Sequence, residues 1–487
     1  MATALPSNRA PFSVDEVLAV TGGVLVRRGS ELPAVGVCTD TRKLQAGNLF
    51  VALRGPTFDG HAFLQTAHAQ GASMFLLSQH VTAPGEGSVI RVPDTLIALG
   101  LLGKAHRQRW ARDARKTGRK AEVVAITGSA GKTTTSRAVT AALGAIAPNA
   151  VHSPLGNLNN QVGVPVVLLG LESRHRFAVV EIGTNSRGEI AYGASLAEPD
   201  VGVLTLVSCA HGEGIGTLED IAHEKGFLLE AVGAQGVAVA NADDPRARAQ
   251  MLRSRAQSFL TYGSDSAADV RLVAREPQDL SAQKIVFEVA GKKLEVATPL
   301  LGEAGAYAAG AALAVCLAVT DGKADLAAVA QALGAMQAEE GRLRPRQLDS
   351  GLVVIDDAYN ANPASMAASI RAASELAGKM GRPLVLVLGE MRELGMQSRQ
   401  EHERLGAVAQ QSGAVRILAV TGAARLLADA AAACGANTQY AEDSAAAATM
   451  IREGLTGNEV VLVKGSRGVA LERVVAALEA EGQKGSA

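Results

Sequence analysis

Short apolar runs recur along the chain, and each is followed by a segment of helical character. From residue 121 onward these runs read VVAIT, FAVVEI, VGVLTLV and GVAVAN, and later VVID, LVLVLG, RILAVT and VVLVK. Continuous apolar runs of this length are typical of strands that are buried on both faces. Their alternation with helices predicts an α/β fold built on parallel sheets that helices cover.

Two changes in this pattern divide the chain. Before residue 95, a Ser-x-x-Glu capping box at 13–16 predicts a short helix that ends at Gly22, and residues 36–53 alternate as strands and turns do. Near residues 339–351, charged side chains, a proline and a glycine interrupt the apolar runs. We therefore expect three α/β domains. They are a small N-terminal domain of residues 1–94, a central domain of residues 95–340 and a C-terminal Rossmann-like domain of residues 341–487.

The composition agrees with several domains in one chain. With 487 residues, 48% of them hydrophobic and 3% aromatic, the chain exceeds the size at which a single core keeps growing. Its 47 basic and 48 acidic residues nearly cancel, which removes the electrostatic reason to expect nucleic acid or an anionic membrane as the main partner. The four cysteines lie far apart without a CxxC pair, so neither disulfides nor a zinc knuckle is indicated, and a reducing cytosol fits.

Three segments bear on location and partners. The N-terminus lacks the apolar core of a signal peptide. The uncharged stretch from Ala304 to Thr320 consists mostly of alanine and glycine, which favours a packed helix over a membrane span. The basic stretch 106–120 fits either a solvated linker helix or a nucleic-acid patch, and a single charge run favours the linker. We therefore expect a cytoplasmic protein that acts on small molecules, with no nucleic-acid partner and no membrane span.

The clearest chemical signal follows the run VVAIT. This run leads into GSAGKTT and then a helical segment, and the loop residues are Gly128, Ser129, Ala130, Gly131, Lys132, Thr133 and Thr134. In a strand–loop–helix of this kind, backbone N–H groups and the helix N-terminus face an anion, and the glycines allow its close approach. Lys132 can reach terminal phosphates, and the Thr133 hydroxyl can ligate Mg²⁺. The spacing GxxGKT is shorter than the usual GxxxxGKT, so a chance glycine turn is the alternative.

Three further residues are candidates for the same site. Glu181 and His211 follow strand-like runs, and ligands of open α/β sheets bind at the carboxyl ends of strands. Glu181 is equally consistent with a helix cap or an ion pair, and a lone histidine is more often structural. Lys225 lies on an expected helix, where the residues alone favour a surface lysine paired with Asp220 or Glu224.

Motifs spread over nearly the full chain resemble the Mur ligase family. The segment CTDTRKLQAGNLFVALRGPTFDGHAF (38–63) is similar to the family's uridine-diphosphate-binding segment, and TGSAGKTTT matches its own short phosphate loop. The segments GNLNNQVGVP (156–165), DDAYNANPASM (356–366) and LGEMRELG (388–395) indicate the branch that acts on a tripeptide substrate. The C-terminal pattern is completed by KGSRGVALE (464–472).

The resemblance implies an ATP-dependent amide-bond ligase of cell-wall precursor synthesis. The N-terminal domain would bind the substrate's uridine diphosphate, the central domain would be a P-loop ATPase domain, and the C-terminal domain would close over the site about a hinge near Gly341. The implied reaction joins D-alanyl-D-alanine to a UDP-N-acetylmuramoyl-tripeptide through an acyl phosphate, and a monomer is expected. The rivals are a sister ligase, against which YNANP and LGEMRELG argue, a P-loop ATPase or kinase, and a nucleotide-binding protein without catalysis.

The resemblance also assigns roles to individual residues. The implied catalytic residues are Lys132, Glu181, His211 and Lys225. Two Mg²⁺ sites are implied, with ligands from Thr133, Glu181, His211 and a carbamylated Lys225. The implied ATP-binding residues are Gly128 to Thr134, Arg342 and, at the ribose, Asp357. The implied substrate-binding residues are Thr41, Arg42, Asn157, Asn159, Asn160, Asn360 and Asn362.

One segment departs from the family pattern. The family has Gly-x-His-Asn-x-x-Asn, whose asparagines hold adenine, but this chain has Ala304, Gly305 and Ala308 at the histidine and asparagine positions. These residues offer no side-chain hydrogen bonds. We therefore expect the purine to be held mainly by stacking and apolar contact, with Tyr307 as a candidate. Replacement of the lost contacts by neighbouring groups is the alternative.

Overall fold

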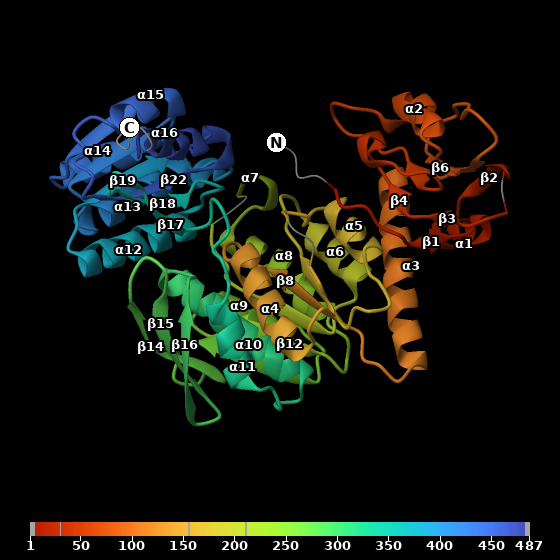
Figure 1. The fold of residues 1–487 in the computed structure, drawn as a ribbon, viewed down its shortest axis with the longest axis horizontal. Helices are drawn as coiled ribbons and strands as arrows, with labels where there is room; N and C mark the ends of the chain where they lie inside the picture. The colour runs from red at the N-terminus through yellow and green to blue at the C-terminus, as the bar shows by residue number, and fades with distance from the viewer. Residues whose placement is uncertain (1–4, 30, 154–155, 210–211, 483–487) are drawn as a thin grey trace.

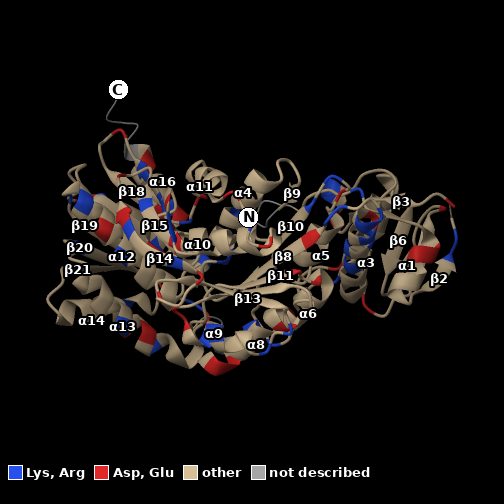
Figure 2. Cartoon of the chain, turned by 90° about the horizontal axis from the view of Figure 1, so that it is seen from below, with Lys and Arg blue, Asp and Glu red and all other residues tan. Residues whose placement is uncertain are grey.

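The structure is a computed structural model that describes residues 5–29, 31–153, 156–209 and 212–482. Three α/β units follow one another along the chain, from the N-terminal unit in red to the C-terminal unit in blue (Figure 1). The expected three-domain α/β class is confirmed, whereas the domain limits expected from the sequence remain predictions. Basic and acidic residues are interspersed along the cartoon in Figure 2, in agreement with the balanced net charge.

The N-terminal unit begins with the predicted capping box. Ser13 Oγ accepts a hydrogen bond from the Glu16 N–H at 3.2 Å, and Glu16 Oε2 accepts one from the Ser13 N–H at 2.9 Å. Gly22 ends the helix with a φ of 65°, as predicted. The elements are β1 (Pro11–Phe12), α1 (Val14–Thr21), β2 (Val24–Arg27), β3 (Ala34–Val35), β4 (Val37–Cys38), β5 (Leu49–Val51), α2 (Leu64–Ala69), β6 (Met74–Leu77) and β7 (Ser88–Arg91). They form a five-stranded sheet in the order β2-β7-β6-β5-β4, beside a ribbon of β1 and β3.

Helix α3 (Thr95–Lys116) connects two hydrophobic cores. Leu99 and Leu102 belong to the N-terminal core, whereas Trp110 belongs to a core of the middle unit. Arg107 is buried and donates to the carbonyl groups of Ala197 and Glu198, which end another helix and lack partners within it. The prediction of a solvated linker helix is therefore wrong for this face, because its cationic and aromatic side chains anchor the helix to the middle unit.

The middle unit contains a nine-stranded sheet. Its strands are β8 (Glu122–Thr127), β9 (Val151–His152), β10 (Phe177–Glu181), β11 (Val201–Leu204), β12 (Val237–Asn241), β13 (Ser258–Gly263), β14 (Val270–Pro277), β15 (Gln283–Val289) and β16 (Lys292–Thr298). The order is β16-β15-β14-β13-β12-β11-β8-β10-β9. Neighbours from β9 to β14 run parallel, as the apolar runs predicted, whereas β14, β15 and β16 form an antiparallel meander. The buried positions of β15 alternate, which is typical of an antiparallel strand with one covered face.

Helices cover both faces of this sheet. They are α4 (Lys132–Ile146), α5 (Gly163–Leu169), α6 (Glu189–Ala197), α7 (Gly212–Ile215), α8 (Leu218–Glu230), α9 (Pro245–Met251), α10 (Gly302–Val319) and α11 (Leu326–Gly334). Helices α4, α10 and α11 share one core, and α5 and α6 pack with α3 in another. Among the described helices only α10 is long and apolar enough to cross a membrane, but 72% of that stretch is buried inside the protein. The packed helix expected at 304–320 is therefore confirmed.

The C-terminal unit has the expected Rossmann-like arrangement. Its elements are β17 (Arg344–Gln347), β18 (Val353–Asp357), α12 (Pro363–Met380), β19 (Leu384–Gly389), α13 (Ser398–Gln411), β20 (Arg416–Val420), α14 (Ala424–Ala433), β21 (Thr438–Ala441), α15 (Ser444–Met450), β22 (Val460–Lys464) and α16 (Glu472–Gly482). The sheet order is β17-β18-β22-β19-β20-β21, and only the edge strand β17 is antiparallel to its neighbour.

One charged face of α12 joins the C-terminal unit to the middle unit. Arg371, Glu375 and Lys379 are spaced by four residues and therefore share a side of the helix. Their respective partners are Glu303 at 3.5 Å, Arg275 at 2.5 and 2.7 Å, and Glu276 at 2.8 Å. The central pair is bidentate, which is the strongest geometry for an arginine and a carboxylate. These three pairs hold α12 against α10 and β14.

Reversing the charge of Glu375 should weaken this contact. Glu375→Arg removes the bidentate pair and places two guanidinium groups together, so we expect the free energy of unfolding in urea to fall by ~1–2 kcal/mol. The swapped variant Arg275→Glu/Glu375→Arg should recover most of that loss. Glu403→Arg, in an exposed pair with Arg399 on α13, is the matched control and should change little. A swap no more stable than Glu375→Arg alone would contradict the pairing.

Candidate active site

A cavity of about 1050 Å³ lies between the middle and C-terminal units. On the middle unit it is lined by the last residues of β10 and β12 and by the loops that follow β8, β10, β11 and β12. On the other side it is lined by the end of β18 and the start of α12. The cavity therefore lies at the carboxyl ends of parallel strands, where open α/β sheets bind ligands.

The loop after β8 has the geometry of a phosphate-binding loop. Gly128 has a φ of 155° and Gly131 a φ of 82°, conformations that side chains rarely adopt. A Cβ atom at residue 128 would also clash with the Thr205 hydroxyl. Helix α4 begins at Lys132, so its first N–H groups face the cavity, and Lys132 Nζ donates to the Gly128 carbonyl at 2.8 Å. Strand, loop and helix therefore occur in the predicted order.

The predicted residues around Glu181 form one hydrogen-bonded cluster. Thr133 Oγ1 donates to Glu181 Oε2 at 2.9 Å, and Asn159 Nδ2 donates to Glu181 Oε1 at 2.6 Å and also to Asn157. From the C-terminal side, Arg342 Nη2 donates to Thr133 Oγ1 at 3.1 Å. Residues that are up to 209 positions apart in the sequence thus meet at the phosphate loop.

Lys225 lies inside the protein, on α8. Its side chain is among the largest that are fully buried, so the expectation of a surface lysine is wrong. The supposed partners are engaged elsewhere: Asp220 caps α8, and Glu224 accepts from the N–H groups of Gly188 and Ile190. Burial lowers the pKa of Lys225 well below its usual value, nearby Lys132 lowers it further, and Glu224 raises it.

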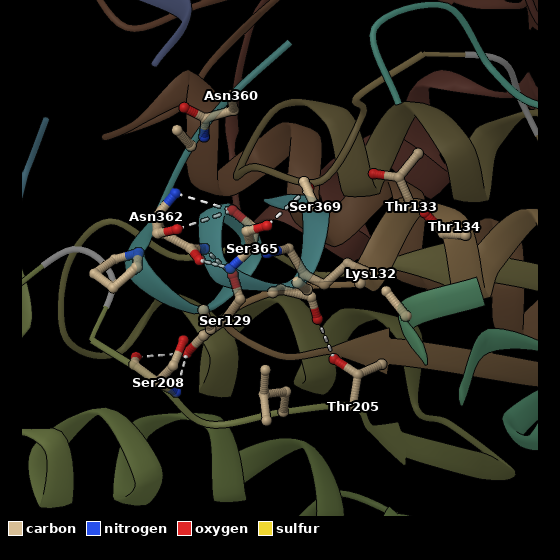
Figure 3. A pocket seen from close by; sticks show the side chains of 18 of the residues that line it. Ser129, Lys132, Thr133, Thr134, Thr205, Ser208, Asn360, Asn362, Ser365 and Ser369 are labelled. Atoms are coloured by element: carbon tan, nitrogen blue, oxygen red, sulfur yellow. Dashed lines mark hydrogen bonds between the residues drawn. The ribbon is translucent and has the colours of Figure 1, made fainter. Parts of the chain in front are cut away.

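The N-terminus of α12 reaches across to the phosphate loop. Asn362 caps the helix by accepting from the Ser365 N–H, and its Nδ2 donates to the Ser129 carbonyl at 3.0 Å. Figure 3 shows Asn362 and Ser129 on facing sides of the pocket, with Asn360 above them. Asn362 therefore does two things at once: it begins α12 and joins the two units.

Asp357 lines the cavity from the end of β18 and is buried. Its Oδ2 accepts from Ser369 Oγ at 2.5 Å and pairs with Lys464 Nζ at 2.7 Å. Lys464 also donates to the Asn360 carbonyl at 3.0 Å. The sequence interpretation missed Lys464 and Ser369, although Lys464 ends the apolar run VVLVK, where a strand-end residue could have been expected.

Three residues that were predicted to contact the substrate lie outside the cavity lining or make other hydrogen bonds. Thr41 and Arg42 lie on a 3-10 turn of the N-terminal unit, outside the cavity lining. Arg42 is exposed and pairs with Asp40 at 2.6 Å. Asn160 lines the cavity, but its Oδ1 accepts from the N–H groups of Val162 and Gly163 and so holds the start of α5.

The start of α10 forms the part of the cavity wall where the family pattern has asparagines and this chain has none. Ala304 and Gly305 line the cavity there, next to Tyr307. The Tyr307 hydroxyl donates to Asp243 Oδ2 at 2.7 Å, and Asp243 also accepts from the N–H and the hydroxyl of Ser264. These polar groups satisfy one another within the wall. Asp243 was not predicted to lie there, because it is 64 residues away from Tyr307 in the chain.

Oxygen donors next to the phosphate loop suit magnesium. Thr133 and Glu181 offer a hydroxyl and a carboxylate 2.9 Å apart, and Mg²⁺ prefers such ligands. Within the described part of the chain, no group of three His, Cys, Asp or Glu side chains is placed to hold a metal ion. An ion here would therefore take its remaining ligands from a bound phosphate and from water, as Mg²⁺ commonly does. His211, the other expected ligand, lies outside the described residues.

Comparison with known proteins gives matches over most of the chain. Residues 34–105 match the family model described as "Mur ligase family, catalytic domain", residues 126–316 the "Mur ligase middle domain" and residues 341–467 the "Mur ligase, glutamate ligase domain". The chain is 34% identical over 460 residues to the UDP-N-acetylmuramoyl-tripeptide–D-alanyl-D-alanine ligase of Escherichia coli K12, covering 93% of this chain and 96% of that protein.

Solved structures agree with these matches. A crystal structure of MurF from Acinetobacter baumannii superposes with a TM-score of 0.85 at 28% identity, covering 97% of this chain and 100% of that one. MurF ligase from Thermotoga maritima in complex with ADP superposes with a TM-score of 0.79 at 25% identity, covering 94% and 98%. By its motifs, its three units and these full-length similarities, the chain belongs to the Mur ligase family.

Proposed function

We propose that this chain is the ATP-dependent ligase that joins D-alanyl-D-alanine to a UDP-N-acetylmuramoyl-tripeptide, giving the pentapeptide, ADP and phosphate. The observation that carries the proposal is the cavity in which the phosphate loop, Glu181 and the start of α12 meet. A simple P-loop ATPase or kinase would not need the asparagine-rich 156–165 loop and the C-terminal unit at its phosphate site. The similarity to a ligase of this name over 96% of that protein's length supports the substrate pair.

The first step of the reaction activates a poor electrophile. A carboxylate oxygen of the tripeptide attacks the γ-phosphorus of ATP, the bond to the bridging oxygen breaks, and ADP leaves with an acyl phosphate formed. Gly128 to Thr134 would bind the ATP phosphates, and Lys132 and Arg342 would offset charge on the transferring group. Asp357 would contact the ribose from the C-terminal side. Positioning by these groups supplies most of the rate enhancement, because phosphoryl transfer requires little covalent catalysis by the protein.

The second step forms the amide. The free amine of D-alanyl-D-alanine attacks the acyl carbon, loses a proton, and phosphate leaves. An α-amino group has a pKa near 8, so a useful fraction is neutral at cellular pH and no strong base is required. Asn157, Asn159, Asn160, Asn360 and Asn362 are the proposed contacts to the peptide substrates. Thr41 and Arg42 of the N-terminal unit are proposed to contact the uridine diphosphate.

The proposed metal sites use oxygen ligands. Thr133 and Glu181 would hold Mg²⁺, which when bound offsets charge on the phosphoryl oxygens. A second site would use Glu181, His211 and Lys225, the last as a carbamate. The Lys225 amine, whose pKa burial lowers, can add CO₂ and release a proton, and the resulting carboxylate-like anion suits both a cation and nearby Lys132. We further propose that the enzyme is a cytoplasmic monomer with domain limits near residues 94 and 340.

The proposal is tested by following products and ATP together. The chain is incubated with ATP, Mg²⁺, D-alanyl-D-alanine and a UDP-N-acetylmuramoyl-tripeptide. Two such substrates are compared, one whose peptide ends in meso-diaminopimelate and one whose peptide ends in lysine. Mass spectrometry should detect one pentapeptide for each phosphate released with the preferred tripeptide. ATP hydrolysis without amide formation would instead indicate an ATPase, and no turnover with any tripeptide would reject the proposed substrates.

The wall at the start of α10 predicts weak selection of the purine. Ala304 and Gly305 offer no side-chain hydrogen bonds, and Tyr307 and Asp243 are bonded to each other, so few groups are left unpaired when guanine replaces adenine. We expect kcat/KM to favour ATP over GTP by only about 10 to 100-fold. Tyr307→Leu should raise KM for both nucleotides, and Tyr307→Phe, which keeps the ring, should not. A preference for ATP of about 10⁴-fold would show that specific hydrogen bonds to the base exist.

A further inference from the structure

Arg342 projects from a segment that is fixed to the C-terminal unit. The Gly341 N–H donates to Asp356 Oδ2 at 3.0 Å, and the Leu343 N–H donates to Asp357 Oδ1 at 3.1 Å. The Gly341 carbonyl accepts from the Tyr359 N–H at 3.2 Å. Gly341 and Leu343 have φ values of 71° and 52°, so Arg342 lies in a tight turn that these bonds stabilise. The segment therefore moves with β18.

The turn directly before this segment belongs to the other unit. Glu339 pairs with Arg137 of α4 at 3.3 Å. The Glu339 carbonyl also accepts from the Arg342 N–H at 3.1 Å, so this turn joins the two units directly. The Arg342 guanidinium already lies 3.1 Å from the Thr133 hydroxyl in this structure, so this edge of the C-terminal unit holds Arg342 at the phosphate loop.

A single aromatic ring sets the direction of the Arg342 side chain. The guanidinium carbon of Arg342 lies 4.1 Å from the centre of the Tyr359 ring. Arg467 lies 5.2 Å from the same ring and donates to the Tyr359 hydroxyl at 3.3 Å. Tyr359 is half-buried in the cavity wall, so its contact with Arg342 is partly desolvated. The ring is thus held by one arginine and supports the other.

We propose that Tyr359 is a positioning residue that holds Arg342 on the phosphate loop for phosphoryl transfer. The inference rests on the proposed function, because Arg342 is taken to bind the transferred phosphoryl group. Tyr359 acts through its ring face, and its hydroxyl serves the contact with Arg467. The residue itself takes no part in bond making.

The test is a double-mutant cycle of Tyr359→Leu and Arg342→Ala. Tyr359→Leu should lower kcat by about 3 to 30-fold, the effect of losing one partly desolvated cation–π contact, with little change in the KM of D-alanyl-D-alanine. The double variant should be no slower than Arg342→Ala alone. Tyr359→Phe should restore most of the rate. Tyr440→Leu, which removes a similar ring under Arg425 in the same unit, is the matched control and should leave kcat unchanged.

Two results would overturn the inference. Losses that multiply in the double variant would mean that Tyr359 acts independently of Arg342, and a raised KM for one substrate would mean that Tyr359 contacts that substrate directly. A parallel cycle on the Kd of a non-hydrolysable ATP analogue with Mg²⁺ does not depend on ligation. If the wild-type chain forms no amide, the proposed function fails, while non-additive Kd values would still support the positioning of Arg342.

Discussion

Replacing Lys132 with alanine is expected to lower kcat for acyl-phosphate formation by ~10³-fold or more. Lys132 is the first residue of α4 and lies on the cavity, where its ammonium group adds to the positive end of the helix. In the described structure its one hydrogen bond is to the Gly128 carbonyl, a contact worth about 1 kcal/mol to the fold. The charge is therefore available to the transferring phosphoryl group, and its loss should affect rate far more than stability.

The measurement separates these two effects. ADP release and hydroxylamine trapping of the acyl phosphate, in reactions without D-alanyl-D-alanine, report the first step alone. Thermal unfolding reports the fold, and the melting temperature of Lys132→Ala should stay close to that of the wild type. Lys292→Ala, at an exposed position of β16, is the matched control for removing a lysine from the same unit. Near-normal turnover in a folded Lys132→Ala protein would refute the assignment of the loop.

Features that depend on neighbouring residues could be predicted from the sequence. The Ser13–Glu16 capping box, the end of α1 at Gly22 and the strand–loop–helix around Lys132 are each formed by side chains and backbone groups a few residues apart. The parallel strands were predictable for a related reason, because strands buried on both faces need continuous apolar runs. The antiparallel pairing of β14, β15 and β16 was not predicted, since these strands mix apolar with polar positions and lack the continuous apolar runs of the parallel strands.

Features that depend on contacts between units could not be predicted. Asn362 reads locally as a helix cap, and its second bond goes to Ser129, 233 residues away. The basic face of α3 reads as solvated, because the carbonyl groups that accept from Arg107 belong to another helix. In both cases the neighbouring residues predicted the helix correctly, but they could not predict the distant group to which the side chain donates. The family resemblance placed Asn362 in the site without showing that it joins the two units.

Lys225 is the case in which the local rule failed. Acidic residues one and five positions away suggested a surface pair, but the helix turns the lysine inward and its pKa is lowered by burial. We expect Lys225→Ala to lower kcat by ~10³-fold, because it removes the anion that the proposed carbamate supplies beside Lys132 and the metal. The truncated side chain leaves space, so acetate or propionate should enter and restore part of the activity.

Lys225→Met is the control that distinguishes a carbamate from a packing role. Methionine fills nearly the same buried volume without an amine, so the fold should be retained and activity lost, but the space is closed and added carboxylates should not help. A buried lysine that serves only packing predicts the opposite: Lys225→Met active, and Lys225→Ala unstable and insensitive to acetate. In the wild type, ¹³C-labelled bicarbonate should give a carbamate carbon signal that is absent from both variants, because CO₂ adds to the Lys225 amine, which neither variant has.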